Sequence, residues 1–213
     1  KIYARIRLWG SIGFILLAVV SGELIEQYGS EVFTYIGLFT LIALYLSTLI
    51  FRQPYMHASK MQAASSIIEK FRQWNFIAFF IAGLLLQISF GPYNGFFALF
   101  LRDLDYPGYG VGAMIAIGVT AEIAIFVYAG KLFQAFSVKT LLVFSIFISA
   151  FRWYLAGHFG DNAWILSFTQ LFHAAGFGIY HSACMQFIQQ HFDANQQNRG
   201  QAIYIAGVYG IGG

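Results

Sequence analysis

Four ionisable side chains interrupt otherwise apolar stretches of this sequence: Glu122, Arg152, His173 and His181. Arg152 is the clearest case, because the run around it, FISAFRWYLAG (147–157), is otherwise suited to hydrocarbon. A charge at the centre of a membrane helix costs about 2.5–3.5 kcal/mol on insertion scales, so such residues usually serve a function. The first question is therefore what Arg152 contacts.

Helix geometry places three of these groups at similar depth. With a rise of about 1.5 Å per residue, Glu122 lies roughly 16 Å and His173 roughly 15 Å from the outer ends of their spans. The Cα atom of Arg152 lies roughly 8 Å from the outer end of its own span, and its long side chain can reach further inward. We therefore expect Arg152 to pair with Glu122, with His173 as neighbour or relay. The alternative is that Arg152 extends to the membrane surface and His173 bonds a backbone carbonyl.

The composition identifies the elements that hold these groups. Of the 213 residues, 59% are hydrophobic and only 10% are charged, whereas soluble domains carry about 25% charged residues. A membrane span needs about 20 mostly apolar residues. Seven such stretches are present: 8–24, 32–51, 75–101, 111–133, 140–157, 163–187 and a truncated 201–213. The sequence therefore predicts a fragment of an all-α integral membrane protein, with seven transmembrane helices.

The basic residues predict the orientation of these spans. Ten of the twelve Lys and Arg residues lie before the first span or in every second connection, one (Arg102) lies on the other side, and Arg152 lies within the membrane. By the positive-inside rule, the start and the connection 52–74 are cytoplasmic. We expect a multi-pass protein of the bacterial inner membrane. The net charge of +3 comes from short loops, which does not favour nucleic-acid binding.

The connection 52–74 is the only long one. Within it, Ile67, Phe71 and Trp74 recur at helical spacing, which predicts a short helix on the cytoplasmic membrane surface. The alternative is a solvated linker.

Two further stretches hold candidate binding residues. In SFGPYNGFF (89–97), Pro92 removes a backbone hydrogen bond, so the helix is expected to bend or open and to line a cavity. A proline kink that serves only packing is the alternative. In YARIRLWGSIGF (3–14), an arginine and a serine four residues apart share one helix face, although arginines at the start of a span are most often anchors. The candidate residues are Tyr93 and Asn94 in the first stretch, Gln87 just before it, and Arg7, Ser11 and Phe14 in the second.

Four separated stretches resemble the 3-phenylpropionate transporter family, a branch of the major facilitator superfamily related to lactose permease. They are YARIRLWGSIGF, VTAEIAIFVYAGKLF (119–133), FRWYLAG (151–157) and SFTQLFHAAGFGIYHSACMQFI (167–188). The resemblance implies that the chain is a fragment holding helices five to eleven of a twelve-helix fold. Residues 1–51 would then end the N-terminal half, 52–74 would form the central cytoplasmic loop, and 75–213 would begin the C-terminal half.

The resemblance also implies roles for individual residues. Arg7 falls on the substrate-binding arginine of lactose permease, and Glu122 falls on its buried helix-eight glutamate. Arg152 and His173 fall on an arginine and a histidine of its coupling network. One departure is that the helix-ten glutamate of proton coupling falls on Gly176.

A second departure is that the two helix-seven aspartates fall on Phe90 and Tyr93. A cavity with two arginines, few carboxylates and many aromatic rings suits a small aromatic carboxylate better than a sugar. His181 and Cys184 are expected to serve packing. His173 and Cys184 share a helix face, but two ligands without a third do not make a metal site.

The sequence therefore predicts a proton-coupled symporter that moves a small aromatic carboxylate, such as 3-phenylpropionate, by alternating access. The alternatives are a sugar or nucleoside symporter and, further away, a membrane-embedded enzyme with His173 or His181 as base. We expect no enzyme activity, cofactor or metal, and a monomer whose partners are the substrate, protons and the lipid bilayer. The expected substrate-binding residues are Arg7, Ser11, Phe14, Tyr93, Asn94 and Trp153, and the expected proton-coupling residues are Glu122, Arg152 and His173.

Overall fold

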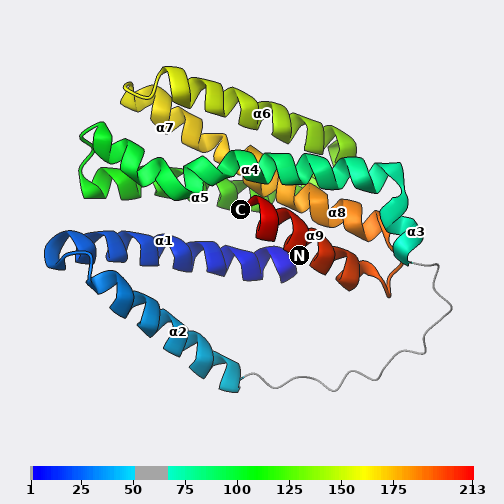
Figure 1. Ribbon diagram of the computed structural model, residues 1–213, viewed down its shortest axis with the longest axis horizontal. Helices are drawn as coiled ribbons and strands as arrows, with labels where there is room; N and C mark the ends of the chain where they lie inside the picture. Colours follow the sequence, from blue (N-terminus) through cyan, green and yellow to red (C-terminus); the bar gives the residue numbers. More distant parts are fainter. Residues whose placement is uncertain (1, 51–66) are drawn as a thin grey trace.

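The computed structural model describes residues 2–50 and 67–213, except for the side chains of residues 2–8, 11 and 129 (Figure 1). Every regular element in this part of the chain is helical, which confirms the all-α class. The elements are α1 (Ile2–Tyr28), α2 (Val32–Ile50), α3 (Ile67–Arg72), α4 (Trp74–Asp103), α5 (Gly108–Ala135), α6 (Val138–His158), α7 (Ala163–Leu171), the π-helical segment η1 (Ala174–Ile179), α8 (Tyr180–His191) and α9 (Gln197–Gly212).

Each predicted span coincides with helical structure, and most helices extend a few residues beyond the predicted bounds. Among the described residues, four helices are long and apolar enough by themselves to cross a membrane: α2, α4, α5 and α6. The predicted sixth span is divided among α7, η1 and α8, and α9 has only 16 residues. Length and composition alone therefore support four of the seven predicted spans.

Polar caps determine where two of the helices begin. The side chain of Ser137 accepts a hydrogen bond from the N–H of Thr140 at 3.1 Å, at the start of α6. The side chain of Asn162 accepts two N–H groups of the first turn of α7, at 3.0 and 3.2 Å. A side-chain cap of this kind typically stabilises a helix by about 1 kcal/mol. The caps thus favour the observed starts of α6 and α7.

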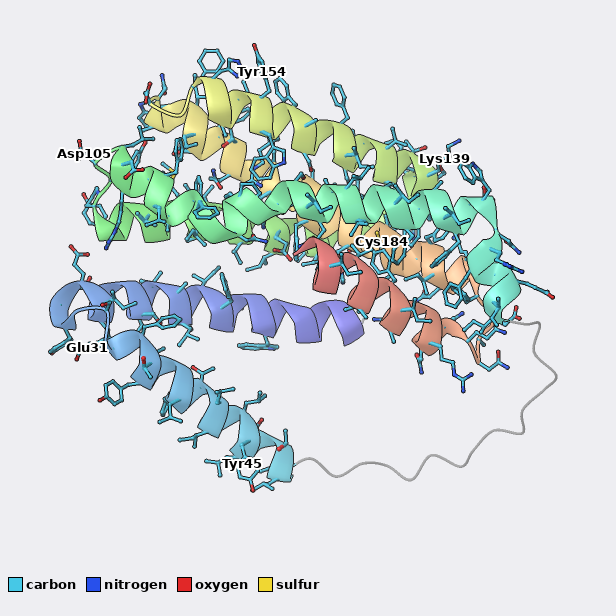
Figure 2. The ribbon with its side chains drawn as sticks, viewed as in Figure 1. Glu31, Tyr45, Asp105, Lys139, Tyr154 and Cys184 are labelled. Carbon is cyan, nitrogen blue, oxygen red and sulfur yellow. The ribbon has the colours of Figure 1, made fainter. Side chains whose placement is uncertain are left out.

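The helices form an antiparallel bundle (Figure 1). The α1–α2, α4–α5 and α6–α7 connections gather at one end, and α3 lies beside the α8–α9 connection at the other. In Figure 2, Lys139 lies at the opposite end of the bundle from Glu31 and Asp105. Helix α1 packs on α5, α4 packs on α9, and both α5 and α6 pack on α7 and η1. The segment from α7 to η1 therefore lies between α5 and α6.

Helix α3 is the short helix predicted in the long connection. Its Phe71 ring lies 5.0 Å from that of Phe76 and 5.2 Å from that of Phe192, measured between centroids. Ile67 packs against the same cluster. Ile67 and Phe71 thus pack on the protein, whereas Ile68 is exposed. A location of α3 at the membrane surface stays a prediction. Residues 51–66 lie outside the described part of the chain.

The chain departs from α-helical geometry in the sixth predicted span rather than in the third. Helix α4 continues through Pro92 as one α-helix and does not open there, while a bend at Pro92 stays a prediction. A proline inside a helix removes one backbone hydrogen bond, and the flanking turns of α4 keep theirs. The irregular segment is instead η1, and π-helical turns of this kind are frequent at functional sites.

Candidate functional site

Arg152 on α6 lies at the centre of a buried polar cluster. Its side chain is 1% exposed. One terminal nitrogen, Nη1, lies 3.2 Å from Nδ1 of His173, and the other, Nη2, donates to Oε1 of Gln170 at 3.1 Å. The hydroxyl of Tyr93 donates to the same Gln170 oxygen at 3.0 Å. The cluster therefore joins α4, α6 and the C-terminal end of α7.

The contact with Arg152 fixes the state of the His173 ring. A guanidinium group can only donate hydrogen bonds, so Nδ1 of His173 must accept, and the neutral ring carries its proton on Nε2. A doubly protonated ring would place a donor opposite a donor and a positive charge beside another. Protonation of His173 would therefore break its bond to Arg152. The ring of His173 also stacks on that of Phe177, with centroids 5.5 Å apart and planes 6° from parallel.

Aromatic rings surround the Arg152 guanidinium on its faces. Its central carbon lies 4.3 Å from the ring centroid of Tyr93, 4.4 Å from that of Trp153 and 5.8 Å from that of Phe90. A desolvated cation–π contact contributes about 2 kcal/mol or more. These rings partly replace the water that the buried cation has lost.

The predicted ion pair between Arg152 and Glu122 is wrong. Within the described residues, the hydrogen-bonding side chains that reach Arg152 are His173 and Gln170, and no carboxylate forms an ion pair with it. The reason is the arrangement of the helices side by side. Helix α7 and η1 lie between α5, which carries Glu122, and α6, which carries Arg152. Gln170 was missed, although a polar residue one helical turn before His173 was a signal for it.

A cavity of about 700 Å³ lies between α1, α4, α5 and η1. Its volume falls in the range of about 300–1,000 Å³ typical of small-molecule sites. Aromatic rings dominate the wall, together with two amides, one carboxyl group and one imidazole. The side chains that carry these groups are Phe14, Phe90, Tyr93, Phe97, Phe177, Gln87, Asn94, Glu122 and His173. We call this space the main cavity.

The main cavity brings several predicted residues together. Phe14, Tyr93 and Asn94 line it, as do Glu122, which is 6% exposed, and His173. Arg7 and Ser11 belong to α1, next to the lining residue Gly10, but their side chains lie outside the described part. That Glu122 and His173 line the same cavity agrees with the similar depth predicted for them.

A second, smaller pocket of about 310 Å³ lies between α4, α6 and α7. Trp153, predicted as a substrate-binding residue, lines this pocket and not the main cavity. Its indole Nε1 donates to the hydroxyl of Ser89 at 3.3 Å. Arg152 also lines the smaller pocket, whereas Tyr93 and Phe97 line both spaces.

A family model described as the MFS_1 like family matches residues 1–213. This chain belongs to the MFS_1 like family. The match confirms the resemblance to major facilitator transporters. With its long apolar helices, the chain is therefore part of an integral, multi-pass membrane protein.

Three relatives illustrate the family. The chain is 31% identical over 212 residues to the probable 3-phenylpropionic acid transporter of Escherichia coli (strain K12), an alignment that covers 96% of this chain and 54% of the relative. It is 27% identical over 214 residues to the maltose permease of Geobacillus stearothermophilus, with 99% and 53% covered. It is 25% identical over 216 residues to an uncharacterized transporter of Bacillus subtilis (strain 168), with 99% and 52% covered. The chain thus spans about half the length of these relatives. No solved structure matches it significantly.

Membership of the MFS_1 like family decides between two of the earlier hypotheses. The family and all three relatives are transporters and not enzymes, which argues against a membrane-embedded enzyme.

The two residues predicted to serve packing, His181 and Cys184, have structural contacts. Nδ1 of His181 lies 3.1 Å from the hydroxyl of Tyr209, and the sulfur of Cys184 accepts a hydrogen bond from Tyr204 at 3.1 Å.

The structure explains the glycine at position 176. A Cβ atom there would collide with Oγ of Ser149 and lie 3.1 Å from the Phe90 ring. Ser149 is itself buried and donates to the carbonyl of Ser145 at 2.8 Å. A glutamate, which the resemblance places at this position in lactose permease, therefore cannot fit between η1 and α6.

Proposed function

We propose that the complete protein is a proton-coupled symporter that moves a small aromatic carboxylate across the membrane by alternating access. The main observation in support is the main cavity, because an aromatic wall and a few polar groups surround a space of small-molecule size. The similarity to the probable 3-phenylpropionic acid transporter of Escherichia coli supports the same class of substrate. Substrate would bind between the two halves, 1–51 and 75–213, near the bilayer midplane.

The cavity wall offers contacts for both ends of such a substrate. The rings of Phe14, Tyr93 and Phe177 would stack on the aromatic ring of the substrate. The amide of Asn94 would bond a carboxylate oxygen. We assign the second carboxylate contact to Arg7, one helical turn before Ser11 on α1, because a guanidinium binds carboxylates with two parallel hydrogen bonds.

The buried ionisable groups would couple transport to protons. Glu122 and His173 line the same cavity, and His173 contacts Arg152 through Nδ1. In this proposal Glu122 takes up the proton that accompanies the substrate. A change at His173 would then reach Arg152 and the packing of α6 on α7, because the Nδ1 contact joins these helices.

The test uses the full-length protein in membrane vesicles. Addition of 3-phenylpropionate should make the outside medium more alkaline as protons enter with the substrate, while 3-phenylpropionamide should not. Arg7→Lys should lose uptake strongly at matched expression, because an ammonium cannot reproduce the two-pronged contact. Arg5→Lys is the control and should be nearly silent. Equal, mild effects of both variants would remove Arg7 from the substrate site.

A sugar symporter is the second candidate, favoured by the maltose permease among the relatives. Gln87 and Asn94 could bond sugar hydroxyl groups, and aromatic rings also stack on sugar rings. Maltose in the same alkalinisation assay distinguishes the two candidates. Alkalinisation by maltose and not by 3-phenylpropionate would replace the carboxylate proposal. Nucleosides belong in the same series of substrates.

We also propose a monomer in the bacterial inner membrane, with the start of the chain and the connection 52–74 in the cytoplasm. Cysteines placed in that connection should be labelled only from the cytoplasmic side. Cysteines in place of Asp103 or Asp161 should be labelled only from outside. Labelling in the reverse sense would overturn the orientation.

A further inference from the structure

The smaller pocket beside Arg152 has the composition of a ligand site, although the proposed function uses only the main cavity. We infer that this pocket is a second binding site, which takes a small aryl carboxylate. It shares the substrate class of the proposed function, but it lies between α4, α6 and α7 and not at the main cavity.

The buried positive charge of Arg152 favours an anionic ligand. The side chain is 1% exposed, and its Nε has no hydrogen-bond partner within residues 2–50 and 67–213. No carboxylate of the described residues forms an ion pair with it. A buried cation without an anion is strongly unfavourable in a low-dielectric environment. A ligand carboxylate would bond Nε and Nη2 side by side, the geometry in which arginine binds carboxylates most strongly.

The residues that line the pocket favour a ligand whose carboxylate is attached to an aromatic ring. Besides Arg152 and Gln170, the lining consists almost entirely of rings and small residues. The rings belong to Tyr93, Phe96, Phe97, Phe100 and Trp153. A sugar would leave most of its hydroxyl groups without partners against these walls, which is costly.

The size of the pocket limits the ligand. A volume of about 310 Å³ lies near the lower end of the range for small-molecule sites. One ring with a short carboxylate chain fits this space. Trp153 and Phe100 lie on opposite helices, α6 and α4, so a ring between them would contact both walls.

The rings of Tyr93 and Phe97 form the partition between the two spaces. Tyr93 lines both, and its hydroxyl is held by Oε1 of Gln170. A carboxylate on Nη2 of Arg152 would compete with that same Gln170 oxygen. Occupation of the smaller pocket would thus weaken the contact that keeps the partition in place.

The experiment compares two cysteine variants of the full-length protein in nanodiscs of zwitterionic lipid. Ala156→Cys reports on the smaller pocket and Ala98→Cys on the main cavity, because each residue lines only one of them. The native Cys184 is fully buried. At a 3-phenylpropionate concentration of about ten times its Kd, only about a tenth of a site is free, so alkylation of Ala156→Cys should slow by about tenfold. The neutral 3-phenylpropionamide should protect by less than about twofold, and adding Arg152→Gln should abolish the protection at Ala156→Cys.

The outcomes separate this inference from the proposed function. Protection of Ala98→Cys with unchanged alkylation of Ala156→Cys would overturn the second site and leave the proposed function standing. Protection of neither variant would overturn both. If Ala156→Cys does not react even without ligand, tryptophan fluorescence decides: a 3-phenylpropionate-dependent change should be lost in Trp153→Phe and kept in Trp164→Phe, whose ring is 87% exposed. An undiminished fluorescence change on addition of 3-phenylpropionate to Trp153→Phe would overturn the inference. Protection that needs added anionic lipid would mean that a lipid headgroup, and not an aryl carboxylate, is the ligand.

Discussion

Two histidines of the segment from α7 to α8, His173 and His191, have similar neighbours along the helix and different roles. His173 stacks on Phe177, four residues later, with centroids 5.5 Å apart and an interplanar angle of 6°. His191 stacks on Phe187, four residues earlier, at 5.3 Å and 13°. Side chains four residues apart meet on one helix face, so both stacks are local features.

The nitrogen partners of the two rings come from distant parts of the chain. Nδ1 of His173 accepts from Arg152 on α6, whereas Nε2 of His191 donates to the backbone carbonyl of Lys70 on α3 at 3.0 Å. The first contact joins a buried charge to the main cavity. The second holds a short helix against the end of the bundle. The role of a histidine in an aromatic stack therefore depends on the hydrogen-bond partner of its ring nitrogen.

The largest expected effect comes from breaking the cluster at Arg152. Arg152→Lys should reduce uptake to about a hundredth or less, because a buried charge that loses its partners costs about 3–5 kcal/mol. A lysine cannot contact His173 and Gln170 together. Uptake at matched expression is the measurement, with Arg199→Lys as the control because Arg199 is exposed. Retained uptake in Arg152→Lys would show that positive charge alone is sufficient there.

Replacing each histidine by phenylalanine keeps the stack and removes the nitrogen. His173→Phe should lower uptake by about ten- to a hundredfold, because a buried donor of Arg152 without a partner costs about 1–3 kcal/mol. His191→Phe should keep uptake within about twofold and speed hydrogen exchange in α3, where only a hydrogen bond to Lys70 is lost. Equal losses of uptake in the two variants would contradict the difference between the sites.

Packing beside His173 is tighter than on the exposed side of α9. Gly176→Ala should lower the stability in detergent by about 1–3 kcal/mol, because the added methyl collides with Ser149. Gly210→Ala, with no atom within 4 Å of its Cβ, should raise stability by up to about 1 kcal/mol. Thermal unfolding measures both. The double variant Gly176→Ala, Ser149→Ala should recover part of the loss, and no difference between the two glycines would mean that η1 can move away from α6.

The smallest effect is expected at the side chain of Lys70. Its ammonium lies 3.8 Å from Oδ1 of Asp193, whose side chain is half exposed. Exposed ion pairs of this kind contribute about 0–1 kcal/mol. Lys70→Gln should therefore leave both α3 exchange and uptake nearly unchanged, since His191 bonds the backbone of Lys70. Faster exchange in α3 of this variant would assign the docking of α3 to the ion pair instead.

Much of the fold followed from local properties of the sequence. The apolar stretches predicted the bounds of most helices to within a few residues. The rise per residue of a helix predicted that Glu122, Arg152 and His173 lie at a similar depth. The contact of Arg152 with His173 and the shared cavity of Glu122 and His173 agree with that depth. The domain division and the roles of the candidate site residues stay predictions.

The lateral order of the helices was not available from the sequence. Hydropathy gives depth along the membrane normal, but it does not say which neighbour a helix has. Helices α2 and α4 both qualify as spans, yet α2 has no buried residue and α4 has seven. For the same reason the sequence paired Arg152 with Glu122, whereas the structure has α7 and η1 between their helices.

The sequence by itself determined that this chain is helical, lies in a membrane and carries a buried arginine among aromatic residues. These properties depend on side-chain type and on spacing within one helix, which the sequence states directly. Only the tertiary structure decided that Gln170 bonds that arginine, that Tyr93 and Phe97 separate two spaces, and that Ser149 closely approaches Gly176 of η1. Contacts between helices depend on which helix faces are pressed together, and many apolar faces pack almost equally well.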